Sequence, residues 1–148
     1  MANVEAVQGL EDVQKVLADM AKRFDNLKPF MSEAINIVKN RTEESFEKES
    51  APDGTPWTPL KNPRDGKILH KSGDMEDSLW TDADKRSATI GFSMKSEDGY
   101  AYPAVHQFGT ENGRIPARPF LPIRPDGELM DDVVREIMEV FTEIANLN

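Results

Sequence analysis

Two histidines are the side chains of this sequence best suited to acid–base or metal chemistry. His70 and His106 could hold a hydrolytic metal together with Asp74 or Glu111, since imidazole and carboxylate are common ligands of divalent cations. The chain has no HExxH motif, EF-hand loop, P-loop or GxGxxG motif to support such chemistry. His106 lies in an apolar segment, where a hydrogen-bonded structural histidine is the better interpretation. We therefore predict no metal and no cofactor.

Nucleophilic and carboxylate chemistry have equally little support. The sequence contains no cysteine, and none of its serines lies in a GxSxG motif. Glu43, Glu44, Glu47 and Glu49 crowd one short stretch, but paired acids catalyse proton transfer only in a cleft that excludes water. We expect these carboxylates to be solvated at the end of a helix, and we expect the protein not to be an enzyme.

A cluster of basic side chains follows Trp57 in the sequence: Lys61, Arg64, Lys67, His70 and Lys71. Basic groups beside an aromatic ring can hold a nucleic-acid backbone and stack on its bases. Acidic residues interrupt the cluster, however, and favour a second interpretation. In that hypothesis a mobile loop docks on an acidic partner, such as the C-terminal face of another copy.

The charge balance weighs against several classes of protein. The chain of 148 residues has 18 basic and 27 acidic side chains, and its net charge of −9 weakens any general affinity for nucleic acid. No apolar run approaches the ~18 residues of a membrane span, and the first residues lack the pattern of a secretory signal. We therefore expect one domain, made in a cytoplasm. Seven acidic residues against one basic concentrate negative charge in residues 126–148.

Hydrophobic periodicity predicts the elements that position these residues. Apolar residues at three- and four-residue steps predict a helix over 9–26, followed by a second helix over 29–49 with Pro29 in its first turn. The far end of the second helix is polar, and we expect it to project from the core. Residues 51–67 hold four prolines and two Asp-Gly pairs, which predict a long loop.

Shorter elements are predicted after the loop: a helix start at Ser72, a hairpin of strands over 79–81 and 87–92, and a helix over 103–108. Prolines at every third position from Pro116 to Pro125 exclude a central strand there. Residues 126–148 carry a broad apolar stripe among acidic residues, which is typical of a helix that packs across a sheet.

These patterns predict an α+β fold with two N-terminal helices, a small mainly antiparallel β-sheet, and a long C-terminal helix packed across the sheet. We expect a single domain over residues 1–148. Its predicted parts are a helical segment (1–50), the Pro/Gly loop (51–67), a sheet-containing core (68–125) and the acidic C-terminal helix (126–148).

Four short parts of the sequence also carry a resemblance to a known family. In chain order they are PDGTPWTPL (52–60), ILHKSGDM (68–75), ATIG (88–91) followed by YPAVHQFG (102–109), and IPARPFL (115–121). In this order they resemble the phage virion morphogenesis family, which includes the tail-completion proteins of Mu-like and P2-like bacteriophages. Met75 and Pro103 stand where the family more often has Leu and Ala, and neither change removes a functional group.

The resemblance implies a structural virion protein that completes the tail and joins it to the head at the neck, as a ring, commonly six-fold, around the DNA channel. The implied partners are further copies of the chain and the neighbouring neck and tail proteins, namely a head-closure or connector protein and the tail terminator or tube. DNA would only pass through the channel, and no membrane is involved. The protein would be made in the bacterial cytoplasm and end in the virion. We expect its acidic C-terminal surface to face the channel and to repel DNA.

The residues predicted to act in assembly or to carry the family's motifs are Trp57, Lys61, Arg64, Lys67, His106, Phe108, Gly109, Arg118 and Phe120. Arg118 lies on a rigid backbone between two prolines, and we expect its guanidinium to pair with a carboxylate. Phe120 is expected to fill the core between helix and sheet. Three alternatives stay open: a tail terminator, a head-closure protein, and, from another class, a metal-dependent phage nuclease that uses His70 and His106.

Overall fold

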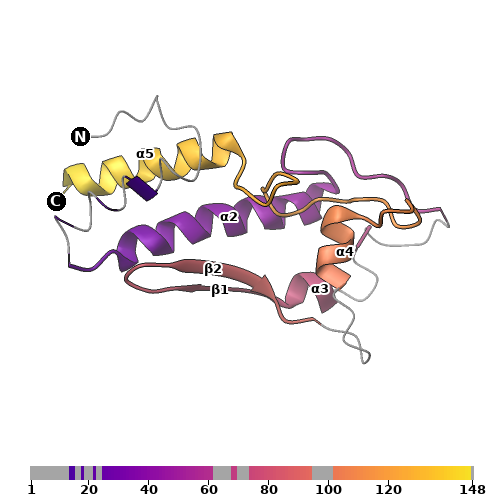
Figure 1. Cartoon of the computed structure of the whole chain (residues 1–148), viewed down its shortest axis with the longest axis horizontal. Helices are drawn as coiled ribbons and strands as arrows, with labels where there is room; N and C mark the ends of the chain where they lie inside the picture. The colour runs from indigo at the N-terminus through magenta and orange to yellow at the C-terminus, as the bar shows by residue number, and fades with distance from the viewer. Residues whose placement is uncertain are drawn as a thin grey trace. The chain divides into compact units, whose positions relative to one another are not determined.

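A computed structural model describes residues 14, 15, 18, 22, 25–61, 68–69, 74–94 and 102–147 of the chain. The elements are, in chain order, α2 (Lys28–Lys48), α3 (Asp74–Asp77), β1 (Leu79–Ala83), β2 (Ala88–Phe92), α4 (Tyr102–Phe108) and α5 (Asp131–Leu147) (Figure 1). The two strands form one antiparallel sheet among these helices. The predicted α+β class is therefore confirmed.

Helix α2 begins where the sequence predicts it. The side-chain oxygen of Asn26 accepts a hydrogen bond from the Lys28 N–H at 3.0 Å, which satisfies one of the free donors of the first turn. Pro29 follows in that turn, where its missing N–H removes no helical bond. The helix ends at Lys48, and the next residue, Glu49, has a φ of 53°, which is typical of the position just after a helix end. The helix predicted over 29–49 is confirmed.

The helix predicted over 9–26 lies mostly outside the described residues. Residues 14, 15, 18 and 22 are described, and all four are helical. The chain is no longer helical over 25–27, so an end of that helix before α2 agrees with the prediction.

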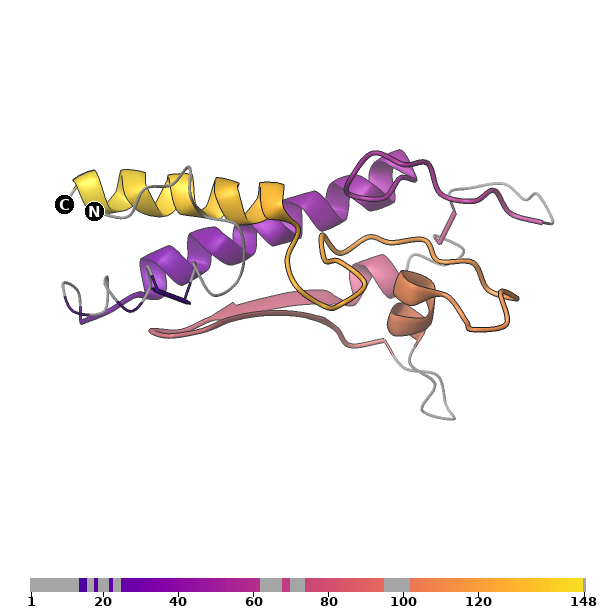
Figure 2. The same ribbon diagram turned by 45° about the horizontal axis from the view of Figure 1, so that its top comes forward.

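The described chain divides into two compact units, and α2 and the hairpin contribute residues to both. Unit 1 comprises the described parts of Met1–Val38, Thr81–Thr89 and Ile123–Asn148. Figures 1 and 2 both show α5 alongside the first half of α2. The rings of Phe30 and Phe141 meet there edge to face, with their centroids 5.5 Å apart.

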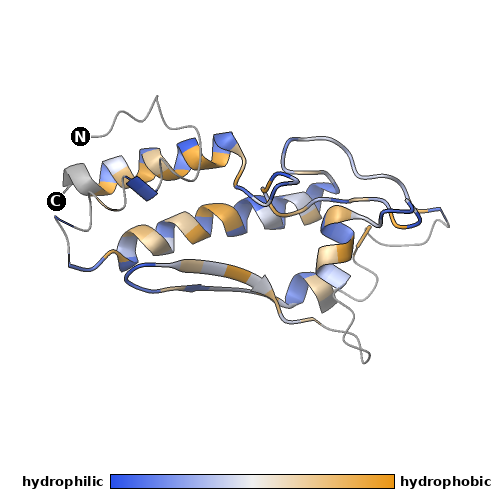
Figure 3. Cartoon of the chain, in the orientation of Figure 1, coloured by the Kyte–Doolittle hydropathy of each residue, from blue (hydrophilic) through white to orange (hydrophobic). Residues whose placement is uncertain are grey.

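Helix α5 begins at Asp131, five residues after the start at 126 that the sequence predicts, because Leu129 pairs with Ile123 in an isolated bridge. It has one apolar and one acidic face, as its sequence predicts. Val133, Ile137 and Phe141 of the predicted stripe are 0–3% exposed, and the hydrophobic colour of α5 gathers on the side toward α2 (Figure 3). Within unit 1, both ribbon views show the first half of α2 between α5 and the turn end of the hairpin. The ring contact of α5 is accordingly with α2.

Unit 2 comprises the described parts of Lys39–Trp80 and Ile90–Pro122. Its core is largely aromatic. The rings of Phe46 and Phe120 stack with centroids 5.0 Å apart, and Trp57 meets Phe46 edge to face at 5.9 Å. These aromatic pairs add packing energy beyond the burial of their area.

The second half of α2 does not project from the core, so that prediction is wrong. Phe46 is 2% exposed, and the polar residues Thr42 and Ser45 before it are buried as well. Threonine and serine are mostly exposed in folded proteins, so their presence predicts that this end of the helix is exposed to solvent. Phe46 nevertheless buries this end of the helix, because its ring packs within the unit 2 core.

The predicted hairpin is confirmed, and β1 continues two residues further than expected. The Asp84 N–H donates to the Ser87 carbonyl at 2.9 Å and closes the turn. The carboxylate of Asp84 accepts hydrogen bonds from the backbone N–H groups of Arg86 and Ser87, each at 2.8 Å. These bonds lower the pKa of the Asp84 carboxyl, because they favour its charged form.

The register of the hairpin places Trp80 opposite Gly91. At the open end the Ser93 N–H donates to the Ser78 carbonyl at 3.0 Å, and this bond and the turn fix the same pairing. A Cβ on Gly91 would lie 2.7 Å from the Trp80 ring, closer than real carbon contacts. Glycine at this strand position therefore lets the indole cover the backbone of the neighbouring strand.

The proline-rich segment contains no regular strand, as predicted. An isolated bridge pairs Ile123 with Leu129 just beyond it, and another pairs Ser50 with Pro56 in the loop after α2. Within the described part of the chain, no helix is long and apolar enough to cross a membrane.

Candidate functional site

Three of the motif segments meet in unit 2, and we call their meeting point the motif junction. It consists of loop residues 57–59, residues 106–109 at the end of α4, and residues 118–121 of the proline-rich segment. Hydrogen bonds between side chains and backbone join the three segments. The junction lies against the aromatic core through Trp57 and Phe120.

Trp57 is held at the junction by a turn that precedes it. The carboxylate of Asp53 accepts a hydrogen bond from the Thr55 N–H at 2.9 Å, which lowers the pKa of the Asp53 carboxyl and shapes the PDG turn. The indole Nε1 of Trp57 then donates to the Pro119 carbonyl at 2.7 Å. Because its side chain is only 4% exposed, Trp57 cannot stack on a nucleic-acid base.

Arg118 crosses from the proline-rich segment to the loop. Its Nε donates to the Thr58 carbonyl at 2.9 Å and one terminal nitrogen donates to the Pro59 carbonyl at 3.2 Å. Among the described residues, these carbonyls are its acceptors in place of the expected carboxylate. Burial lowers the pKa of the guanidinium, since the charged form loses contact with water.

Gln107 is a member of the junction that the sequence analysis did not select. It is 4% exposed, and its Oε1 accepts from the N–H groups of Phe120 and Leu121 at 3.0 and 2.9 Å. Its Nε2 donates to the Leu121 carbonyl at 3.3 Å. The proline-rich segment cannot pair as a strand, so its backbone N–H groups need side-chain acceptors. Gln107 is a polar residue in an apolar motif, and this is the sequence signal that could have identified it as such an acceptor.

Gly109 and Phe120 have the structural roles that their motifs suggest. Gly109 has a φ of 73°, and a Cβ there would lie 2.8 Å from the Ala117 nitrogen, so the close approach of α4 to the next segment needs glycine. Phe120 is fully buried and packs on Phe46 and Phe92.

His106 is a half-buried member of the junction. Its ring stacks on Tyr102, with centroids 6.4 Å apart, and its backbone carbonyl accepts from the Arg118 N–H at 2.7 Å. The buried Nδ1 has no hydrogen-bond partner within the described structure. Burial, and next the nearby charge of Arg118, lower the pKa of the imidazole. No group of three potential metal ligands occurs in the described residues, and His70 lies outside them.

Phe108 is the aromatic residue of the predicted site whose side chain is exposed. It is 53% exposed, although Gln107 and Gly109 on either side of it are fixed in the junction. Two further large aromatic residues that are not among the predicted site residues, Trp80 and Tyr102, are also exposed. Large rigid side chains at the surface are typical of residues that anchor protein contacts.

The basic cluster can be placed only at its first residue. Lys61 is exposed at the end of the described loop, whereas Arg64, Lys67, His70 and Lys71 lie outside the described residues. The hypothesis that this cluster docks on an acidic partner stays a prediction.

The four glutamates of α2 and its end form no water-poor cleft. Glu43, Glu44 and Glu47 are exposed, and the first two pair with Lys39 and Lys48 respectively along the helix. Glu49 accepts a hydrogen bond from the Ile68 N–H at 2.8 Å, which gives it a structural role. Their solvation, predicted from the sequence, is confirmed for the three exposed residues.

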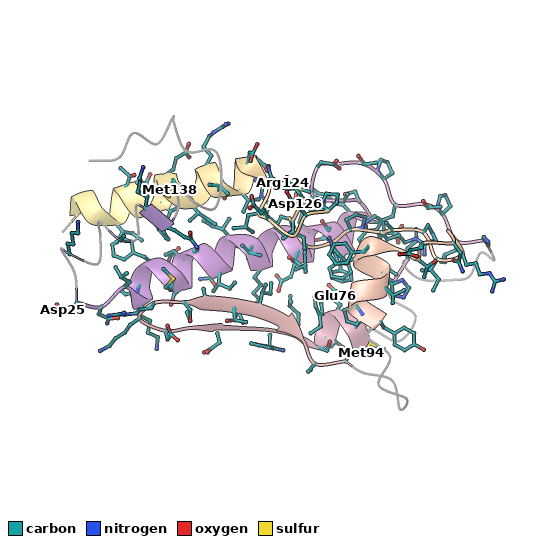
Figure 4. The ribbon with its side chains drawn as sticks, in the orientation of Figure 1. Asp25, Glu76, Met94, Arg124, Asp126 and Met138 are labelled. Carbon is teal, nitrogen blue, oxygen red and sulfur yellow. The ribbon has the colours of Figure 1, made fainter. Side chains whose placement is uncertain are left out.

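Acidic residues just before α5 and at its first position surround one arginine. Arg124 forms ion pairs with Asp126, Glu128 and Asp131 at 3.5, 2.6 and 3.4 Å, and Figure 4 shows Arg124 beside Asp126. Further along, Asp132, Glu136, Glu139 and Glu143 share one face of α5 at helical spacing. This acidic face carries four of the seven acidic residues in 126–148.

Comparison with known proteins identifies one relationship. A model of the phage virion morphogenesis family matches residues 8–141, which is most of the chain. No curated protein and no solved structure matches the sequence.

Proposed function

The chain belongs to the phage virion morphogenesis family, and we propose that it completes a bacteriophage tail and joins it to the head at the neck. Membership gives it a structural or morphogenetic role in the phage particle. In our proposal the protein forms a ring, six-fold by expectation, around the DNA channel. It acts by binding its own copies and the adjacent head-closure, connector, terminator or tube proteins, and it catalyses no reaction.

The construction of the motif junction is the observation that carries this proposal. Its buried members hold one another, while Phe108 stands 53% exposed between two fixed neighbours. An aromatic side chain on a rigid backbone loses little conformational entropy when it enters a partner's pocket. The junction is thus suited to binding a protein, and Phe108 is the proposed contact residue.

The basic residues Lys61, Arg64 and Lys67 supply a second proposed contact, with an acidic surface of a neighbouring copy. Opposite charges attract across such an interface and guide the approach of the two surfaces. Reversal of all three charges should weaken assembly. Unchanged assembly of that variant would remove this contact from the proposal.

The acidic face of α5 has a place in the same proposal. Asp132, Glu136, Glu139 and Glu143 would line the channel, where like charges keep passing DNA from binding the wall. A structure of the assembled ring tests this placement directly. A bore lined by residues 55–71 instead would contradict it.

Electron microscopy of lysates from a phage or prophage with this gene disrupted tests the function itself. Separate DNA-filled heads and tails of normal length are expected, because each part would be complete but unjoined. Absent tails, or tails of uncontrolled length, would indicate a tail terminator instead. Intact infectious particles would refute any essential role in joining. Supplying the intact gene in trans is the control, and it should restore joined particles.

A further inference from the structure

We propose that the β1–β2 hairpin is an assembly edge, at which β2 of one copy pairs with β1 of the next copy in the ring. This inference rests on the proposed ring and adds the surface through which its copies meet. A two-stranded hairpin is marginal as a free-standing sheet and gains stability from a further strand. The required partner is a second copy of this chain, placed head to tail.

Among the residues that the structure describes, both outer edges of the hairpin are unpaired. In the register set by the turn and by the Ser93–Ser78 bond, alternate residues direct their N–H and C=O groups away from the partner strand. These residues are Leu79, Thr81 and Ala83 on β1, and Ala88, Ile90 and Phe92 on β2. Within the described chain, no hydrogen bond from another element reaches them, and no third strand joins the sheet. Free groups of this kind are a template for strand addition.

The edges carry few of the features that block strand addition. The segments LWTDA and ATIGF contain no proline or lysine, and Asp82 is their one charged residue. Proteins that keep an edge strand from pairing usually place proline, lysine or an inward charge there. The composition of this hairpin instead allows pairing, since five of its ten strand residues are threonine, isoleucine or aromatic residues.

The direction of the strands suits cyclic symmetry. When hairpins point the same way around an axis, β2 of one copy runs antiparallel to β1 of the next. Each copy then uses its β1 edge for one neighbour and its β2 edge for the other. Such a contact is heterologous and can close into a ring. Pairing of two identical edges would instead end at a dimer.

Charges at the tip favour the same arrangement. Asp82 and Asp84 lie on the β1 side, whereas Lys85 and Arg86 lead into β2, and all four are exposed. Head-to-tail pairing brings the acidic side of one tip beside the basic side of the next. Pairing of β1 with β1 would bring the Asp82 carboxylates together, and like charges on paired strands are destabilising.

Cross-linking between single cysteines tests this edge, because the natural chain has no cysteine. Asp82→Cys and Thr89→Cys are purified separately, checked for folding by circular dichroism, and treated with a short bismaleimide alone and as a mixture. We expect a covalent dimer mainly in the mixture, at several times the yield of either variant alone. Thr89→Cys mixed with Glu139→Cys is the matched control, since residue 139 is exposed and lies on α5 rather than on either strand.

Each of the following results would contradict the proposal that the hairpin is an assembly edge. Efficient cross-linking of Asp82→Cys alone would indicate a two-fold dimer. A ring seen by native mass spectrometry without the 82–89 product would place the contact elsewhere and leave the proposed tail-joining function standing. A chain that stays monomeric and gives no product at high concentration also refutes the edge. Amide exchange provides a second readout: the N–H groups of Thr81 and Ile90 should become protected only in the assembled protein.

Discussion

The side chain of Gln107 pairs with the backbone of Leu121 as a neighbouring strand would. Its Oε1 accepts from the Leu121 N–H at 2.9 Å, and its Nε2 donates to the Leu121 carbonyl at 3.3 Å. The prolines on either side prevent a real strand from continuing there. One buried amide thus satisfies backbone groups that the local sequence leaves without partners.

Gln107→Leu should destabilise the protein by about 3 kcal/mol, because it leaves the N–H groups of Phe120 and Leu121 without their acceptor at a cost of about 1–3 kcal/mol each. Urea unfolding monitored by circular dichroism measures the change. Asn40→Leu, which alters an exposed amide on α2, is the control and should stay within about 0.5 kcal/mol of the parent. Equal effects of the two substitutions would refute the role of Gln107.

Alanine substitutions at two glycines distinguish the cost of backbone strain from the cost of a steric clash. Gly109 and Gly113 have nearly equal φ angles, 73° and 71°, but only Gly109 would bring a Cβ within 4 Å of other atoms. Gly113→Ala should cost about 1 kcal/mol for the left-handed backbone. Gly109→Ala should cost about 1–3 kcal/mol more, because Ala117 must move. Thermal unfolding of the two variants measures the difference, and similar midpoints would show that the contact at Gly109 relaxes freely.

Arg118→Ala should lower stability by about 1.5 kcal/mol, near the low end for hydrogen bonds from a charged donor. The reason is that Thr58 and Pro59 are exposed, so water can replace the guanidinium at their carbonyls. Arg118→Lys retains the charge but not the planar pair of donors, and we expect an intermediate value. Denaturant unfolding gives the stability, and native mass spectrometry gives ring formation. A variant that folds and assembles like the parent would contradict both the structural and the assembly role.

Stability should fall as the pH drops from about 7 toward 5, and His106 should cause part of the loss. Its pKa in the folded protein is lowered, so below the ordinary value of about 6.5 the unfolded chain binds a proton that the folded chain does not. Asp53 and Asp84, whose pKa values are also lowered, lose their contribution only at more acidic pH, near and below about 4. Unfolding free energies of the parent and His106→Gln across this range provide the test. An unchanged slope in the variant would exclude His106.

Phe108→Ser should leave stability within about 0.5 kcal/mol of the parent and should weaken assembly, because the ring is exposed in the single chain. Sedimentation of the purified protein and head–tail joining in particles are the two measurements. Phe120→Ser is the contrasting variant: its side chain is fully buried, so unfolding should precede any assembly defect. Normal joining with Phe108→Ser would remove Phe108 from the proposed contact.

Local patterns were sufficient to predict α2, the hairpin, α4 and α5. Each has a short-range signal, such as Pro29 at a helix start or Gly109 just past a helix end. Contacts between residues that are distant in the sequence produce no such local pattern, so the sequence does not predict them. The acceptors of Arg118 are therefore carbonyls rather than a predicted carboxylate, and any peptide group could have served.

The misjudged residues are those whose type and burial disagree. Trp57 appeared available for stacking because basic residues follow it, yet its indole is fixed to Pro119. Thr42 and Ser45 indicated an exposed helix end, yet Phe46 draws that end into the core. Sequence patterning records the average preference of a residue, whereas these positions depend on one large neighbour.

The bond between Trp57 and Pro119 also orders events during synthesis of the chain. The two residues are 62 positions apart, so at about 5–20 residues per second the acceptor is made roughly 3–12 s after the donor. Phe30 on α2 likewise waits for Phe141. Phe30 and Phe46, one in each half of α2, therefore emerge from the ribosome before their aromatic partners Phe141 and Phe120 are made, and a nascent chain that stops before Pro119 lacks both contacts. We expect chaperones to meet this protein first at α2, and folding to be completed only after translation has passed the proline-rich segment.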